Sequence, residues 1–150
     1  MAGQHALYQG IILDHNRNPR NYRAMADATA RAEAHNPLCG DWFTVYLKTE
    51  DDVIIDASFS GSGCAIAKAS ASVMTAYLRG KTVAETVDVC ARFQALVTAS
   101  PGAPADSALT GDIAAFCGVR EYPVRAKCAM LPWRAALAAL EAPHGDQREK

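Results

Sequence analysis

The stretch 36–41 (NPLCGD) places a thiol and a carboxylate two residues apart, with a glycine between them. In an extended segment, side chains at i and i+2 point to the same face, so Cys39 and Asp41 can both bind the same small ligand. The intervening glycine lets the backbone bend towards that ligand. Two further cysteines, Cys64 and Cys128, stand where a loop is expected to enter a helix. We predict that these four residues form one metal site.

The expected setting of each cysteine favours the thiolate, which is the form that binds metals. Cys64 follows a glycine-rich segment and is expected at a helix N-terminus, where the dipole and free N–H groups stabilise negative charge. Cys128 is expected at the start of the last helix, with Lys127 beside it and Arg125 nearby, and Cys39 follows a proline turn. The separations of 25 and 64 residues differ from the CxxC pairs of zinc fingers, so spacing alone is a weak signal.

Composition bounds the class of protein. The chain has 150 residues, of which 50% are hydrophobic and 21% charged, and its formal net charge is -1. This length favours a single domain over residues 1–150 with a core that needs no disulfides, and with frayed tails at about 1–5 and 143–150. The charge argues against nucleic-acid binding, and no apolar run resembles a signal peptide or reaches the ~20 residues of a membrane span. Five cysteines, an odd number, suit no disulfide framework. We expect a cytoplasmic protein with neither a nucleic-acid nor a membrane partner.

Hydrophobic periodicity predicts an α+β fold, in which a small antiparallel sheet of about three strands packs against several helices. Strands are expected at 28–35, 42–49 and 53–60, and in the last of these Val53, Ile55, Ala57 and Phe59 should share the buried face. The helices are expected at 5–15, 64–79, 82–99, 112–117 and 129–142, with a loop at 100–110 and an extended segment at 119–127. Thr82 and Glu85 have the spacing of a capping box. Pro132 is expected in the first turn of the last helix, where its missing N–H does no harm.

Several polar residues and cysteines outside these four leave alternatives open. His15, Arg17 and Arg20 form a polar cluster at the end of the first helix, which is either a solvated turn or a docking surface for a partner protein. Cys90 lies among apolar residues in mid-helix and is predicted to be a core residue. Cys117 is either a packed residue or a second redox thiol.

Eight short pieces of the chain, in order from about residue 7 to residue 140, together resemble the iron–sulfur assembly proteins of the IscU/NifU N-terminal/SufU superfamily. The pieces are Leu7-Tyr8, Asp14-His15, 18–21 (NPRN), 36–41 (NPLCGD), 61–66 (GSGCAI), 69–72 (ASAS), Gly80-Lys81 and Lys127-Cys128-Ala129. Two details resemble the SufU branch. Lys127 stands where the scaffold branch usually has a histidine, and the segment 100–127 looks like the insertion that marks SufU-type proteins.

The resemblance implies a SufU/IscU-like fold with zinc held by Cys39, Asp41, Cys64 and Cys128. Three thiolates and one carboxylate suit tetrahedral zinc. It also implies a role: accepting persulfide sulfur from a SufS-type cysteine desulfurase and passing it to downstream SUF components. Cys39 would be the acceptor, freed when a histidine of the desulfurase enters the zinc shell.

Two other functions remain open for the same ligands. The first is a scaffold that assembles [2Fe–2S], against which Lys127 and the insertion weigh. The second is a structural zinc domain that only binds partners. The sequence leaves undecided which metal is bound in the cell, the oligomeric state, the downstream acceptor, and whether the chain counts as a sulfurtransferase enzyme.

Overall fold

The computed structural model describes residues 2–37, 40–100, 102–104, 109 and 111–141, with side chains described from Tyr8 onward. Three strands and five helices follow one another along these residues. They are α1 (Ala2–Arg17), β1 (Ala30–Asn36), β2 (Asp41–Glu50), β3 (Val53–Ser62), α2 (Ala65–Leu78), α3 (Val83–Thr98), the 3-10 helix η1 (Gly111–Glu121) and α4 (Pro123–Glu141). The strands form one antiparallel sheet in the order β1-β2-β3. The predicted α+β class and its three strands are confirmed.

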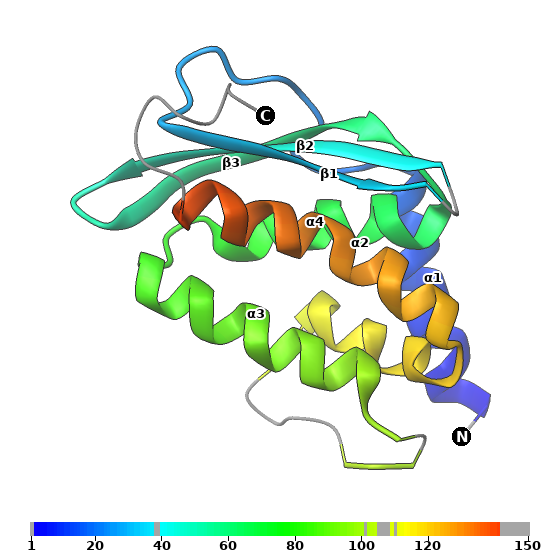
Figure 1. Cartoon of the computed structure of the whole chain (residues 1–150). Helices are drawn as coiled ribbons and strands as arrows, with labels where there is room; N and C mark the ends of the chain where they lie inside the picture. Colours follow the sequence, from blue (N-terminus) through cyan, green and yellow to red (C-terminus); the bar gives the residue numbers. More distant parts are fainter. Residues whose placement is uncertain (1, 38–39, 101, 105–108, 110, 142–150) are drawn as a thin grey trace.

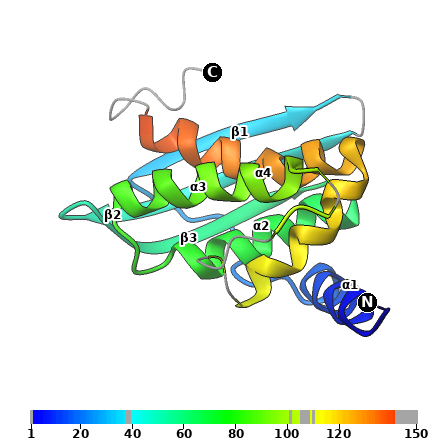
Figure 2. The same ribbon diagram turned by 90° about the horizontal axis from the view of Figure 1, so that it is seen from below.

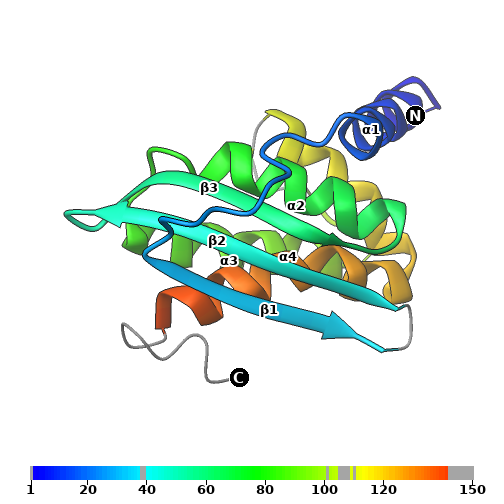
Figure 3. The same cartoon turned by 90° about the horizontal axis from the view of Figure 1, so that it is seen from above.

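The molecule is layered. The sheet covers one side, α2 and α4 run beneath it, and α3 lies below α4 (Figure 1). Seen from below, α1 stands at one end beside α2 (Figure 2). The chain that follows α1 crosses the outer face of the sheet (Figure 3). There the Phe59 N–H donates to the Asn21 carbonyl at 3.0 Å, and the Arg23 N–H donates to the Phe59 carbonyl at 2.8 Å. Of the described helices, none combines the length and apolarity that crossing a membrane requires.

Strand β2 is buried on both faces over residues 43–47, and its apolar side chains alternate along one face, as predicted. Phe43, Val45 and Leu47 face the helices and are fully buried. In β3 this alternation breaks, because the register shifts by one residue where Lys48 pairs with Asp56 and Thr49 with Ile54. Such a bulge turns the following side chains to the other face. Ile54 is therefore buried while Ile55 is 39% exposed, and the prediction that Ile55 shares the buried face is wrong.

The helical layer is held by a cap and by aromatic packing. The Glu85 N–H donates to Thr82 Oγ1 at 3.0 Å and the Thr82 N–H donates to the Glu85 carboxylate at 2.8 Å, which confirms the capping box. Trp133 of α4 stacks on Phe93 of α3 with ring centroids 4.5 Å apart. The Trp133 Nε1–H donates to Ser70 Oγ of α2 at 2.9 Å. Trp133 thus connects three helices in the core.

The segment before the last helix differs from the prediction. Residues 119–127 are not extended: η1 runs through Gly118 to Glu121, and α4 begins at Pro123. Proline suits the first position of a helix because its φ is already helical and that N–H needs no partner. The Tyr122 carbonyl accepts the first N–H bonds of this turn, from Arg125 and Ala126. As a result Pro132 lies inside α4, not in its first turn, and cannot donate the helical bond to the residue four positions earlier.

His15 is buried between helices and contacts two of them, so it is not part of a solvated turn. Its ring is 2% exposed, with Nδ1 at 2.7 Å from Ser72 Oγ of α2 and Nε2 at 2.6 Å from Asp112 Oδ2 of η1. The ring therefore connects α1 to α2 and to η1 through these two contacts. The solvated interpretation is wrong for His15, whereas Arg17 is exposed. That the exposed part of the cluster docks a partner stays a prediction.

Candidate metal centre

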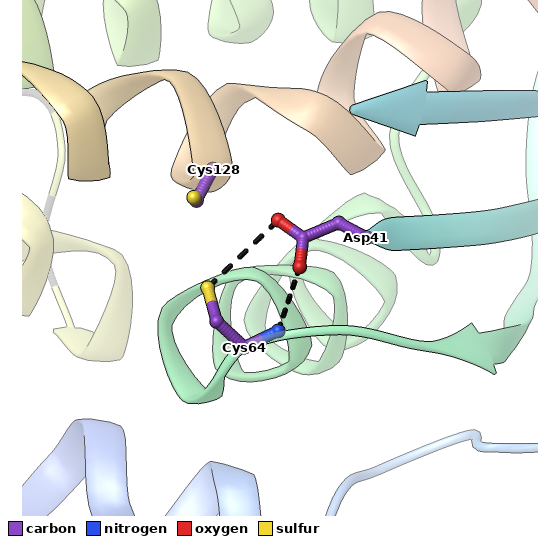
Figure 4. A group of neighbouring side chains, drawn as sticks. All are labelled: Asp41, Cys64 and Cys128. Carbon is purple, nitrogen blue, oxygen red and sulfur yellow. Dashed lines mark hydrogen bonds between the residues drawn. The ribbon is translucent and has the colours of Figure 1, made fainter. Parts of the chain in front are cut away.

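Three elements bring one ligating side chain each to the same point. Asp41 begins β2, Cys64 precedes α2, and Cys128 lies in α4. The side chains point towards one another (Figure 4), and one ligand atom from each lies within 4.8 Å of the others. Residues far apart in the sequence thus form one compact group of a carboxylate and two sulfurs.

Local structure explains the placement of the first two residues. Gly40 turns the chain into β2 with a φ of +71°, which glycine adopts without strain. Cys64 is the N-cap of α2, and its Sγ accepts the Ala67 N–H at 3.5 Å. The prediction that Cys64 opens a helix is confirmed.

Cys128 reaches the site differently from the prediction. It is fully buried inside α4, six residues into the helix that begins at Pro123. A helix N-terminus therefore does not explain its role, because the dipole effect is confined to the first turn. Its expected cationic neighbours, Arg125 and Lys127, are exposed, and Lys127 lines a groove between α3 and α4.

Asp41 is a buried carboxylate without a basic partner among the described residues, as expected of a cation ligand. Its side chain is 0% exposed, Oδ1 accepts the Cys64 N–H at 2.7 Å, and Oδ2 lies 3.9 Å from Cys64 Sγ. Within the described part of the chain, no basic side chain forms an ion pair with it. A carboxylate buried without a positive partner is costly. A bound metal ion would supply the missing positive charge.

The donor set, one carboxylate and two thiols, suits zinc. Ligand atoms around a tetrahedral zinc ion are about 3.5–3.8 Å apart, given bond lengths of about 2.0 and 2.3 Å to oxygen and sulfur. The 3.9 Å between Asp41 Oδ2 and Cys64 Sγ is already near that range. Cys39, the fourth predicted ligand, lies outside the described residues. That it completes the site stays a prediction.

The remaining described cysteines stand apart from this group. Cys90 is 1% exposed, and burial raises the pKa of its thiol to about 12, which confirms its interpretation as a core residue. Cys117 is partly buried on η1 and packs against the core. A redox role for Cys117 is not tested by these contacts.

Gly63 belongs to the family piece 61–66, but the sequence assigned it no role at the site. A Cβ atom on Gly63 would lie only 2.6 Å from Asp41 Oδ1. The signals in the sequence are the position of Gly63 directly before Cys64 and its place in the piece 61–66 (GSGCAI).

The fold and the site define a class: a small α+β protein in which an aspartate and two cysteines that could hold a metal ion come together where a three-stranded sheet meets its helices. The chain belongs to the family of the NifU-like N terminal domain, whose model matches residues 7–129. The predicted membership of the IscU/NifU/SufU superfamily is therefore confirmed.

Relatives in this family carry two different functional names. The chain is 37% identical over 134 residues to the zinc-dependent sulfurtransferase SufU of Bacillus subtilis, covering 89% of each chain. It is 34% identical over 135 residues to the iron–sulfur cluster assembly scaffold protein IscU of Thermotoga maritima, covering 90% of this chain and 93% of that one.

Solved structures agree with this assignment. One is a crystal structure from Fervidobacterium islandicum AW-1 of a protein assigned as an iron–sulfur cluster assembly scaffold for the SUF system. It superposes with a TM-score of 0.81 at 33% identity, covering 91% of this chain and 98% of that one. The N-terminal part of a NifU-like protein from Brucella abortus gives a TM-score of 0.77 at 29% identity, covering 89% and 91%.

Proposed function

We propose that this protein is a zinc-dependent sulfur-transfer protein that accepts persulfide sulfur from a cysteine desulfurase for SUF iron–sulfur cluster assembly. The observation that carries the proposal is the buried Asp41 carboxylate, which faces two cysteine sulfurs and has no cationic partner among the described residues. Sequence identity of 37% to a zinc-dependent sulfurtransferase, over 89% of the chain, supports it.

The zinc ligands in this proposal are Cys39, Asp41, Cys64 and Cys128. Zinc bound by them would keep the thiols deprotonated at neutral pH. Cys128 is held inside α4 and Asp41 is anchored by the Cys64 N–H. Both are therefore suited to hold the ion, not to leave it.

Cys39 is our candidate sulfur acceptor. Its thiolate attacks the outer sulfur of the desulfurase persulfide, a new S–S bond forms, and the bond to the desulfurase cysteine breaks. The desulfurase leaves as a thiolate and Cys39 carries the persulfide, so electrons and sulfur balance. The assignment rests on the family resemblance and on the glycine that follows Cys39, which has a positive φ.

A scaffold that assembles [2Fe–2S] is the second candidate. Relatives named as scaffolds match 90% of the chain at 33–34% identity, and thiolates also hold such clusters. Lys127, where the scaffold branch usually has a histidine, favours sulfur transfer.

The first experiment is desulfurase turnover on L-cysteine, with and without the zinc-loaded protein. Sulfur transfer predicts a large rate increase that disappears in Cys39→Ala and survives in Cys90→Ala, a matched control in the core. An unchanged rate, in a protein that builds a stable cluster from iron and sulfide, would favour the scaffold. If Cys39→Ser still received sulfur at the normal rate, the acceptor assignment would be wrong.

A further inference from the structure

Gly63 occupies a place that has no room for a side chain. A Cβ atom built there would lie 2.6 Å from Asp41 Oδ1, 3.0 Å from Asp41 Cγ and 2.8 Å from Phe43 Cε2. Real Cβ atoms essentially never approach heavy atoms closer than 3.0 Å. The backbone of Gly63 does not require glycine, because its φ lies outside the positive range, unlike those of Gly40 and Gly61. Glycine is therefore needed at position 63 because a side chain would not fit beside Asp41 and Phe43.

Asp41 uses that space. Its Oδ1 lies 2.6 Å from the position a Gly63 Cβ would take, and it accepts the N–H of the next residue, Cys64, at 2.7 Å. One short segment therefore supplies both the room and the hydrogen-bond donor for the same oxygen. The other oxygen, Oδ2, is turned towards Cys64 Sγ at 3.9 Å (Figure 4). With Oδ1 engaged, the carboxylate presents a single oxygen to the group formed with Cys64 and Cys128.

We propose that Gly63 is a positioning residue for metal binding, which holds Asp41 in its ligand orientation by leaving room for the carboxylate against the Cys64 N–H. This inference rests on the metal site of the proposed function. It makes Asp41 a preoriented ligand, because the fully buried carboxylate cannot turn to solvent and one of its oxygens is already bonded. Preoriented ligands lose less freedom when an ion binds.

The test compares Gly63→Ala with Gly10→Ala. A Cβ on Gly10 of α1 meets nothing within 4 Å, so that variant is the matched control. Zinc affinity is measured by competition with a chromogenic chelator, and site geometry by the visible spectrum of the Co²⁺-substituted protein. We expect at least a tenfold loss of zinc affinity and altered Co²⁺ bands in Gly63→Ala, and neither change in Gly10→Ala. Circular dichroism of the metal-free variants reports folding separately.

A double-mutant cycle identifies the contact that matters. In an Asp41→Ala background the new methyl group meets no carboxylate, so Gly63→Ala should cause no further loss of zinc affinity. If Gly63→Ala alone failed to fold while the double variant folded, the clash with Asp41 would again be the cause. A further loss of affinity in the double variant, or a double variant that does not fold, would assign the role of Gly63 to packing against Phe43 and overturn the proposal.

The outcomes also separate this inference from the proposed function. Zinc binding within twofold of wild type in a folded Gly63→Ala protein would overturn the role of Gly63 alone. A wild-type protein that binds no zinc would instead remove the metal site on which both rest.

Discussion

Relative to wild type, replacing Asp41 by asparagine should stabilise the metal-free protein and destabilise the zinc-bound protein. The carboxylate is fully buried, accepts the Cys64 N–H at 2.7 Å and forms no ion pair with a basic side chain of the described residues. Asparagine keeps the shape and the accepting oxygen but removes the charge. Without zinc, Asp41→Asn should therefore be more stable than wild type.

The magnitude follows from the cost of burying an unpaired polar or charged group, which is about 1–3 kcal/mol or more. The unfolding temperature should rise by roughly 2–4 °C for each kcal/mol in a chain of this length. With zinc, a wild-type site with free zinc at 1,000 times its Kd gains about 4.1 kcal/mol. The variant gains less because it has lost an anionic ligand, so wild type becomes the more stable protein.

The assay is urea unfolding followed by circular dichroism, with chelator or with excess zinc. Asp56→Asn is the control, because Asp56 is 28% exposed in its side chain and pairs with Arg23 at 2.8 Å and Arg79 at 3.5 Å. That variant should lose at most about 1 kcal/mol, whether or not zinc is present. A metal-free Asp41→Asn protein that unfolds at lower urea than metal-free wild type would refute the reasoning.

Three further predictions concern single contacts. Thr82→Ala removes the capping box and should lower the free energy of unfolding by about 1 kcal/mol in urea titrations, with zinc binding unchanged. Cys64→Ser should weaken zinc binding in the chelator competition, whereas Cys90→Ser should not, since Cys90 lies outside the metal group. Burial raises the pKa of Cys90 from its usual 9.0 to about 12, so above pH 9 the unfolded thiol loses its proton first. Wild-type stability should then fall between pH 9 and 12 by up to about 1.4 kcal/mol per pH unit relative to Cys90→Ala, and equal slopes in the two proteins would contradict this.

Local signals in the sequence were reliable where a neighbour along the chain decides the structure. The capping box depends only on Thr82 and a residue three positions later, and both of its hydrogen bonds form. Phe43, Val45 and Leu47 of β2 share the face that packs on the helices, because side chains two residues apart in a strand point the same way. Cys64 at a helix start follows from the glycines before it and the small residues after it.

Local signals misplaced the residues whose environment comes from other elements. Pro123 is compatible both with an extended segment and with the first residue of a helix. Only the hydrogen-bonded turn at Tyr122 decides for the helix. Ile55 follows the apolar alternation of β3, but the bulge against β2 turns it outward. His15 is polar and beside a turn, yet Ser72 and Asp112 satisfy both ring nitrogens and allow its burial.

The sequence by itself determined the chemistry available to this protein: three separated cysteines and an aspartate, the order of helices and strands, and the family pattern. Tertiary structure alone decided that Asp41, Cys64 and Cys128 meet within 4.8 Å, that Cys128 does so from inside α4, and that the space at Gly63 admits the carboxylate. The physical reason is the distance along the chain over which each interaction acts. Periodicity and caps act over a few residues, whereas the burial of a charge and the room for one atom depend on packing between β2, α2 and α4.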